Sequence, residues 1–197
     1  MLSILIPNRG EKYIQLFLDE VERILPAYEI IVANDFERKG KGWALREAFI
    51  ESKGDQVAFI DGDGDIEPRM LLRLLPFLDD FDAVVGSKRI THAPLRRKIM
   101  THVTRIWFRF LFGVSVDTQT GIKLFRRAAL STFSNYWEAN GFIFDVEIIA
   151  NIQKRGYKIV EVPVEVEMKS QLAFKTIWTI FWESIWLKCR LLSPRNK

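Results

Sequence analysis

Short apolar segments alternate with longer segments of helical periodicity along most of the chain, and this alternation is typical of an α/β sheet. Residues 2–6 and 29–33 have the composition of strands, and residues 11–25 between them carry apolar side chains at helical spacing. Strand, helix, strand is the opening of a parallel sheet. Further strands are predicted at residues 57–60, 83–86, 122–125 and 158–166, and further helices at residues 43–51, 70–77, 94–112, 141–155 and 173–192.

The third short apolar segment, residues 57–60, leads directly into three aspartates at alternate positions, Asp61, Asp63 and Asp65. Unit charges about 4 Å apart repel by roughly 4 kcal/mol at an effective dielectric near 20, so we expect a cation here. Mg²⁺ or Mn²⁺ with oxygen ligands is the natural candidate. A calcium loop is excluded, because Ile66 and Leu72 occupy its glycine and glutamate positions. A solvated acidic turn is the alternative.

Two predicted helices are amphipathic in a way that suggests a surface role. Residues 94–112 are basic with interleaved aromatic side chains, which indicates either an anionic membrane surface or a solvated outer face. Residues 173–192 present a broad apolar arc, with polar side chains such as Glu183 on the other side. Because this helix contains Trp178, Trp182 and Trp186, we expect it in a membrane interface or on a partner, the alternative being the chain's own core. Pro163 predicts that the last strand is an edge strand.

Composition narrows the function classes. At 197 residues and 48% hydrophobic content the chain can bury one sizeable core. The net charge of +4 is mild, and without a basic and aromatic stripe in the first half nucleic acid is not an expected partner. Cys189 is the one cysteine, which excludes an internal disulfide. No signal peptide and no membrane-spanning apolar run are expected. The basic loop at residues 38–42 indicates either phosphate contact or a solvated turn.

Short motifs follow one another along the chain, most of them directly after predicted strands. They are Pro7 with Glu11, Asp35, Gly40-Lys41-Gly42 with Ala44 and Arg46, Asp61-x-Asp63, Gly86-Ser87-Lys88-Arg89, Arg97 with Thr101, Asp117-x-Gln119-Thr120-Gly121, Gly141-Phe142-x-Phe144-Asp145-x-Glu147 and Glu161-Val162-Pro163-Val164. In this order they resemble the motifs of the family 2 glycosyltransferases with a GT-A fold. Within that family they are most similar to the dolichol-phosphate-mannose synthase group of polyprenyl-phosphate glycosyltransferases.

The chain departs from the family pattern at both ends. Arg9-Gly10 replaces the Tyr-Asn of the opening motif, and the segment between Asp35 and Gly40 is short. The late motif becomes Lys169-x-x-Leu172-x-Phe174-Lys175, which keeps both charges but loses a glycine and a serine, so we expect a remodelled acceptor loop. The C-terminal transmembrane helices common in the family have no counterpart in these 197 residues, and we therefore expect the chain to resemble the peripherally attached members.

The resemblance implies a Rossmann-like GT-A domain over residues 1–170, with a mixed, mostly parallel sheet flanked by helices, and an amphipathic helix over residues 171–197. It implies metal-dependent, inverting transfer of a sugar from a GDP-mannose or UDP-glucose type donor to a polyprenyl or dolichyl phosphate at the cytoplasmic face of the membrane. A small membrane subunit is a further implied partner. The alternatives are a soluble or glycan acceptor, and a silent scaffold that binds lipid or nucleotide.

The resemblance also implies roles for individual residues. Asp61, Asp63 and Asp65 would hold Mg²⁺ or Mn²⁺, and Asp61, Asp63 and Arg97 would carry the catalytic function. The nucleotide-sugar donor would also be bound by Pro7, Glu11, Asp35, Lys41, Lys88 and Arg89. The acceptor would be bound by Arg97, Thr101, Gln119, Lys169 and Lys175. A phosphate acceptor is already anionic near neutral pH, so the leaving nucleoside diphosphate needs more help than the nucleophile does.

Overall fold

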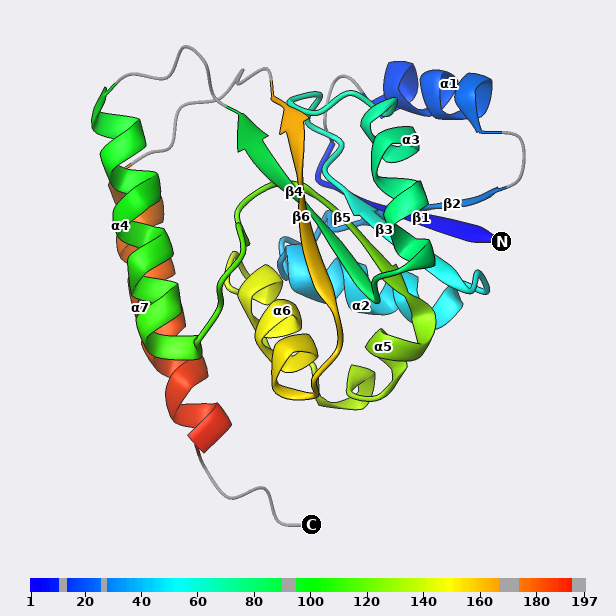
Figure 1. Cartoon of the computed structure of the whole chain (residues 1–197). Coiled ribbons are helices and arrows are strands. Elements are labelled where there is room, and N and C mark those ends of the chain that lie inside the picture. The colour runs from blue at the N-terminus through cyan, green and yellow to red at the C-terminus, as the bar shows by residue number, and fades with distance from the viewer. Residues whose placement is uncertain (11–13, 26–27, 90–94, 167–173, 193–197) are drawn as a thin grey trace.

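Six strands form a single sheet in the computed structural model, which describes residues 1–10, 14–25, 28–89, 95–166 and 174–192. Their bounds are β1 Leu2–Asn8, β2 Tyr28–Asn34, β3 Gln56–Ile60, β4 Ala83–Arg89, β5 Ile122–Arg126 and β6 Ile159–Glu165. The strand order is β2-β1-β3-β5-β4-β6 (Figure 1). β5 is antiparallel to β3 and β4, whereas the other neighbours are parallel. The predicted mixed, mostly parallel sheet is confirmed.

Helices cover both faces of the sheet. Their bounds are α1 Ile14–Ile24, α2 Lys41–Glu51, α3 Met70–Leu74, η1 Leu75–Asp79, α4 Leu95–Phe112, α5 Arg127–Ser131, η2 Ser134–Tyr136, α6 Phe144–Lys154 and α7 Phe174–Leu192. Alternate strand residues point to opposite faces, so Ile4 packs with α1 and α3, while its neighbour Leu5 packs with α2, α5 and α6. Each face has its own core, and both cores are built from strand residues that are fully buried.

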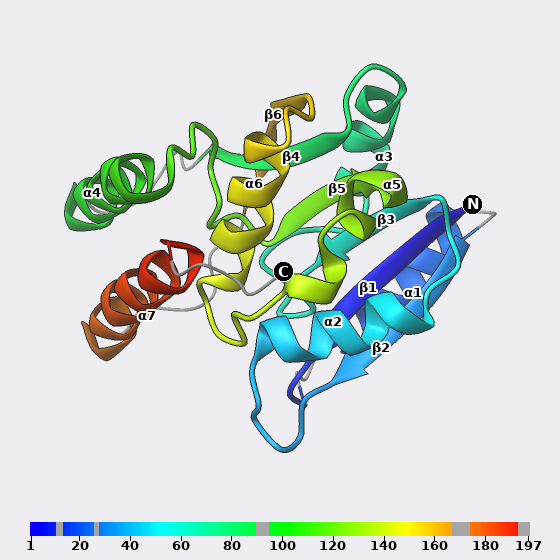
Figure 2. The ribbon, with the colours of Figure 1, turned by 90° about the horizontal axis from the view of Figure 1, so that it is seen from below.

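The two longest helices, α4 and α7, lie side by side at one edge of the molecule (Figures 1 and 2). Trp107 of α4 stacks on Phe181 of α7 with ring centroids 4.9 Å apart, and its Nε1 donates to Ser184 Oγ at 2.8 Å. Leu187 is buried, yet Trp178, Trp182 and Trp186 remain 60%, 54% and 46% exposed. Thus α7 packs on its own chain along one side and presents tryptophans along another. None of the described helices is both long and apolar enough to cross a bilayer.

The edge position predicted for the strand containing Pro163 is confirmed, because β6 is the last strand of the sheet. Two other expectations were wrong. The helix predicted from residue 141 begins at Phe144, and Phe142, predicted to be buried, is 53% exposed. The reason is that residues 141–143 form a separate loop in front of α6. The predicted domain boundary after residue 170 lies outside the described residues.

The first turn of α2 is pressed against the backbone that precedes α6. The Gly42 N–H donates to Asn140 O at 2.8 Å, and a Cβ at Gly42 would lie 2.3 Å from Ala139 O. Gly40 has φ 126°, and its Cβ would lie 2.0 Å from Asn140 O. The glycines on both sides of Lys41 therefore allow the close approach that holds this lysine at the carboxyl edge of the sheet.

We expect Gly42→Ala to lower the free energy of unfolding by about 1–3 kcal/mol, because the added methyl group forces the backbone of residue 139 or the helix to move. Helix propensity alone predicts the opposite sign, a gain of about 1 kcal/mol. Urea unfolding measures the difference. Glu47→Ala on the exposed side of α2 is the control, with a change within about 0.5 kcal/mol. A stabilised Gly42→Ala variant would contradict the close packing.

Candidate active site

Two pockets meet beyond the carboxyl ends of β1, β2 and β3, where open α/β sheets bind their ligands. The smaller pocket, of about 150 Å³, is lined on its outer side by Pro7, Arg9 and Asp35. The larger pocket, of about 420 Å³, extends toward α4 and α7. Four residues line both pockets and so mark their junction: Lys41, Asp61, Asp63 and Phe142.

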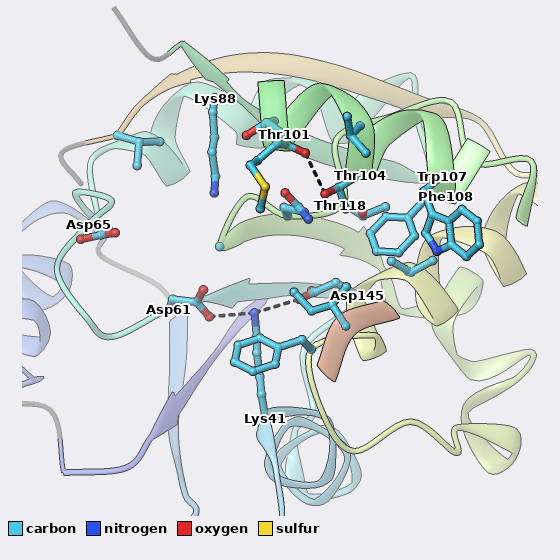
Figure 3. A pocket seen from close by; sticks show the side chains of 18 of the residues that line it. Lys41, Asp61, Asp65, Lys88, Thr101, Thr104, Trp107, Phe108, Thr118 and Asp145 are labelled. Atoms are coloured by element: carbon cyan, nitrogen blue, oxygen red, sulfur yellow. Dashed lines mark hydrogen bonds and ion pairs between the residues drawn. The ribbon is translucent and has the colours of Figure 1, made fainter. Parts of the chain in front are cut away.

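Lys41 is the central charge of this junction (Figure 3). Its Nζ lies 2.8 Å from Asp61 Oδ1, at the end of β3, and 3.0 Å from Asp145 Oδ2, in the first turn of α6. Burial by itself lowers the pKa of Lys41, but the carboxylates of Asp145 and Asp61 outweigh it and raise the pKa above its ordinary value. Lys41 is therefore a fixed cation between two acidic side chains.

Asp145 has a second cationic partner beneath it. Lys123 of β5 is 1% exposed, and its Nζ lies 2.9 Å from Asp145 Oδ1 while donating to Thr120 O at 2.6 Å. Burial raises the pKa of Asp145, but the ammonium groups of Lys123 and Lys41 outweigh burial and hold the pKa below its ordinary value. Asp145 is thus kept ionised, and this charge anchors Lys41.

The acidic loop after β3 places two of its carboxylates, those of Asp61 and Asp63, at the junction of the two pockets. The Asp65 N–H donates to Asp63 Oδ1 at 3.0 Å. Burial raises the pKa of Asp63, and the neighbouring carboxylates of Asp61 and Asp65 raise it further. Within the described ranges no three Asp, Glu, His or Cys side chains form a group that could hold a metal ion, so the predicted set of Asp61, Asp63 and Asp65 is not found as such a group. Mg²⁺ usually takes only one or two protein carboxylates, so Asp61 and Asp63 fit such an ion.

The wall of the smaller pocket is shaped by Asp35. Its Oδ1 accepts from the Lys39 N–H at 2.6 Å, and its Oδ2 accepts from the Gly40 N–H at 2.9 Å and from Arg9 Nε at 3.0 Å. Asp35 therefore folds the short loop into α2 and orients Arg9. The side chain of Arg9 is 45% exposed and lines the pocket together with Pro7.

The larger pocket changes in character along its length (Figure 3). At one end the lining side chains are charged or polar and include Asp61, Asp65, Lys88 and Thr101. Asp63 and Gln119 line the same pocket. The Gln119 loop is held by the buried Asp117, whose Oδ1 accepts from the Gln119 N–H at 2.9 Å. The other end is apolar and is lined by Val103, Trp107, Phe108, Val146, Ile180 and Phe181.

The pockets bring together most of the predicted site residues. Those that line one pocket or both are Pro7, Asp35, Lys41, Asp61, Asp63, Asp65, Lys88, Thr101 and Gln119. Glu11 and Lys169 lie outside the described residues, as do the side chains of Arg89, Arg97 and Lys175.

Four residues of the site had no predicted role: Arg9, Lys123, Phe142 and Asp145. Lys123 gave a usable signal, because a lysine within an apolar strand needs a buried partner.

Comparison with known proteins agrees with this geometry. A family model described as "Glycosyltransferase like family 2" matches residues 4–192. Glycosyltransferase AglD of Haloferax volcanii is 27% identical over 207 residues, which cover 85% of this chain and 33% of that protein. The dolichyl-phosphate beta-glucosyltransferase of Saccharomyces cerevisiae is 28% identical over 65% of this chain and 44% of its own length. The polyprenol monophosphomannose synthase of Mycolicibacterium smegmatis is 27% identical over 64% of this chain and 48% of its own length.

The chain thus spans a third to a half of the length of these curated relatives. Among solved structures, the glucosyl-3-phosphoglycerate synthase of Mycobacterium tuberculosis in complex with Mn²⁺, uridine diphosphate and phosphoglyceric acid superposes with a TM-score of 0.77. The match covers 100% of this chain and 80% of that chain at 18% identity, and it confirms the expected GT-A type of fold. With nearly all of its length matched by the family model, the chain belongs to the glycosyltransferases of family 2.

Proposed function

We propose that this protein transfers a sugar from a nucleoside-diphosphate donor to a polyprenyl phosphate. The observation that carries the proposal is the junction of the two pockets at Lys41, Asp61 and Asp63. A small pocket and a larger, partly apolar pocket share these charged side chains. A diphosphate bound at the junction would therefore place its nucleoside in one pocket and its sugar toward the other. Two of the relatives support this acceptor class, since one is named a dolichyl-phosphate beta-glucosyltransferase and the other a polyprenol monophosphomannose synthase.

The donor half of the proposal assigns the smaller pocket to the nucleoside, with Pro7 and Arg9 on its wall and Asp35 holding that wall in place. Asp61 and Asp63 would hold Mg²⁺ or Mn²⁺, which when bound neutralises the charge that develops on the leaving diphosphate. Lys41 and Lys88 both line the larger pocket, and their ammonium groups would add positive charge near the diphosphate. Glu11 and Arg89 keep their predicted donor roles.

The acceptor half assigns the larger pocket to the lipid phosphate. A phosphate oxygen attacks the anomeric carbon of the sugar, and the bond from that carbon to the diphosphate oxygen breaks with its electron pair going to the nucleoside diphosphate. The nucleophile is already an anion, so the step requires no proton transfer to a general base. Thr101 and Gln119 line the polar end of the pocket near the attacking phosphate. Arg97, Lys169 and Lys175 keep their predicted acceptor roles.

We further propose that α4 and α7 rest on the membrane surface, on its cytoplasmic face. Large apolar side chains are exposed on α4 at intervals of three or four residues: Ile99, Val103, Ile106 and Phe110. The three exposed tryptophans of α7 follow the same helical spacing. Tryptophan prefers the headgroup level of a bilayer, and basic residues near the start of α4 favour anionic lipid. A small membrane subunit stays a prediction from the resemblance.

The proposed function is tested by incubating the protein with a panel of nucleotide sugars, Mn²⁺ and a short polyprenyl phosphate, and analysing the lipid fraction by mass spectrometry. We expect one donor to give a glycolipid whose mass rises by one sugar. Transfer to a soluble or glycan acceptor with none to the lipid would replace the proposed acceptor. Donor binding without any transfer would instead favour the silent scaffold.

Asp63→Ala should abolish the metal dependence of donor binding, because one of the two carboxylates at the pocket junction is removed. The affinity for the donor in the presence of Mn²⁺ should fall by roughly tenfold or more. Titration calorimetry with the nucleoside diphosphate, in the presence and absence of Mn²⁺, measures this loss. Asp80→Ala is the control, since Asp80 is an exposed aspartate that lines neither pocket. Unchanged metal-dependent affinity in Asp63→Ala would remove the proposed metal site.

Replacing Trp178, Trp182 and Trp186 together by alanine should weaken binding to anionic liposomes by on the order of tenfold or more, because three apolar side chains leave the interface. Cosedimentation measures the bound fraction. The exposed Leu16→Ala on α1 serves as the control and should bind like the wild type. Undiminished binding of the triple variant would show that the membrane contact lies elsewhere.

A further inference from the structure

Residues 141–143 occupy a position from which they influence both halves of the site. Phe142 lines the smaller and the larger pocket and is 53% exposed, so its ring lies at the junction rather than in a core. Directly after this loop α6 begins, and its first turn carries Asp145, the anchor of Lys41. A shift of the loop would therefore move a wall of both pockets.

The contact that holds this loop comes from α7. Glu183 Oε2 accepts a hydrogen bond from the Ile143 N–H at 3.3 Å. A Cβ at Gly141 would lie 2.3 Å from Glu183 Oε1 and 2.7 Å from Oε2. The carboxylate of Glu183 thus lies directly against the backbone of the loop, at a distance that only glycine allows. The polar side of the C-terminal helix therefore touches the active site.

Glu183 also completes the start of α6. The N-cap residue of α6, Ile143, makes no side-chain capping hydrogen bond of its own. A carboxylate near the first N–H groups of a helix is stabilising, since these groups have no partner within the helix. Burial raises the pKa of Glu183, while the backbone N–H groups of Ile143 and Phe142 favour its ionised form. A capping group supplied by another helix ties the position of one element to the other.

Other polar contacts of α7 reach α4 and Glu138. Ser184 and Lys188 bond to α4, through Trp107 and the Leu111 carbonyl. Arg190 Nε lies 2.9 Å from Glu138 Oε2 in a largely exposed ion pair, and neither residue lines a pocket. Glu183 is thus the side chain through which α7 reaches Phe142.

From these contacts we infer that Glu183 is a positioning residue, which transmits the placement of α7 to Phe142 at the junction of the donor and acceptor pockets. The inference rests on the proposed function for its effect on catalysis, but the contact itself does not. Any force that moves α7, including its seating on a lipid surface, would reach Phe142 through this carboxylate.

Hydrogen exchange of peptides covering residues 141–147 tests the contact without catalysis. Glu183→Ala should speed exchange of the loop amides by roughly tenfold or more, because bonds to a carboxylate are lost. Glu183→Gln keeps one acceptor oxygen and should restore part of the protection. Arg190→Ala is the matched control on α7 and should leave the loop unchanged. Peptides from β1 and β3 report global destabilisation, and equal acceleration there, or an unaltered loop, would overturn the inference.

Kinetics test the consequence for the site. Glu183→Ala and Phe142→Ala should each lower kcat/KM for the polyprenyl phosphate on the order of ten- to a hundredfold. The double variant should be no worse than the poorer single one, because both substitutions remove the same placement of the ring. Multiplied effects would overturn the role of Glu183. If the wild type transfers no sugar at all, the proposed function fails, whereas the exchange measurement still decides on Glu183.

Discussion

The ion pairs of Lys41 hold three separate parts of the fold together. The ammonium group comes from the first turn of α2, Asp61 from the end of β3, and Asp145 from the first turn of α6. Partly buried charges are stable only when each has a partner, and here Lys123 beneath Asp145 balances the set. Two ammonium groups and two carboxylates alternate, so the loss of any one member leaves the other three with a net charge. Lys41 and Asp61 at the pocket junction take their positions from this chain of charges.

The same arrangement prepares the site for an anionic ligand. A carboxylate has about four lone-pair positions, so Asp61 can keep Lys41 as a partner and still coordinate a cation. Asp63, farther along the loop, adds a carboxyl group outside this chain of ion pairs, and its pKa is raised by burial and by its acidic neighbours. A divalent cation would relieve that repulsion and supply charge for a diphosphate. Lys41 then serves as the fixed part of the positive charge, and the metal as the exchangeable part.

Most of the fold could be predicted from the sequence, because strands such as β1 and β3 are continuous apolar segments that end at polar motifs. The sequence also placed Asp61, Asp63 and Lys88 near one site, since parallel strands end at the same edge. The sequence did not predict which charged residues form ion pairs when they lie far apart along the chain. Lys41 and Asp145 are 104 residues apart, and no local pattern links them. For the same reason Glu183 was predicted only as a polar residue opposite the apolar arc of its helix, and its contact with residues 141–143 was not predicted.

The larger pocket is only partly a product of the sheet, and this bears on the choice of acceptor. One of its walls belongs to α4 and α7, with Trp107, Phe108, Ile180 and Phe181 among the lining residues. Apolar area left against water forfeits about 25 cal/mol per Å², so a ligand that covers this wall gains affinity that a sugar hydroxyl cannot provide. A phosphate at the polar end with a hydrocarbon chain along the aromatic end satisfies both parts. A soluble acceptor would satisfy only the first, and would leave the packing of α7 against the site without a purpose in binding.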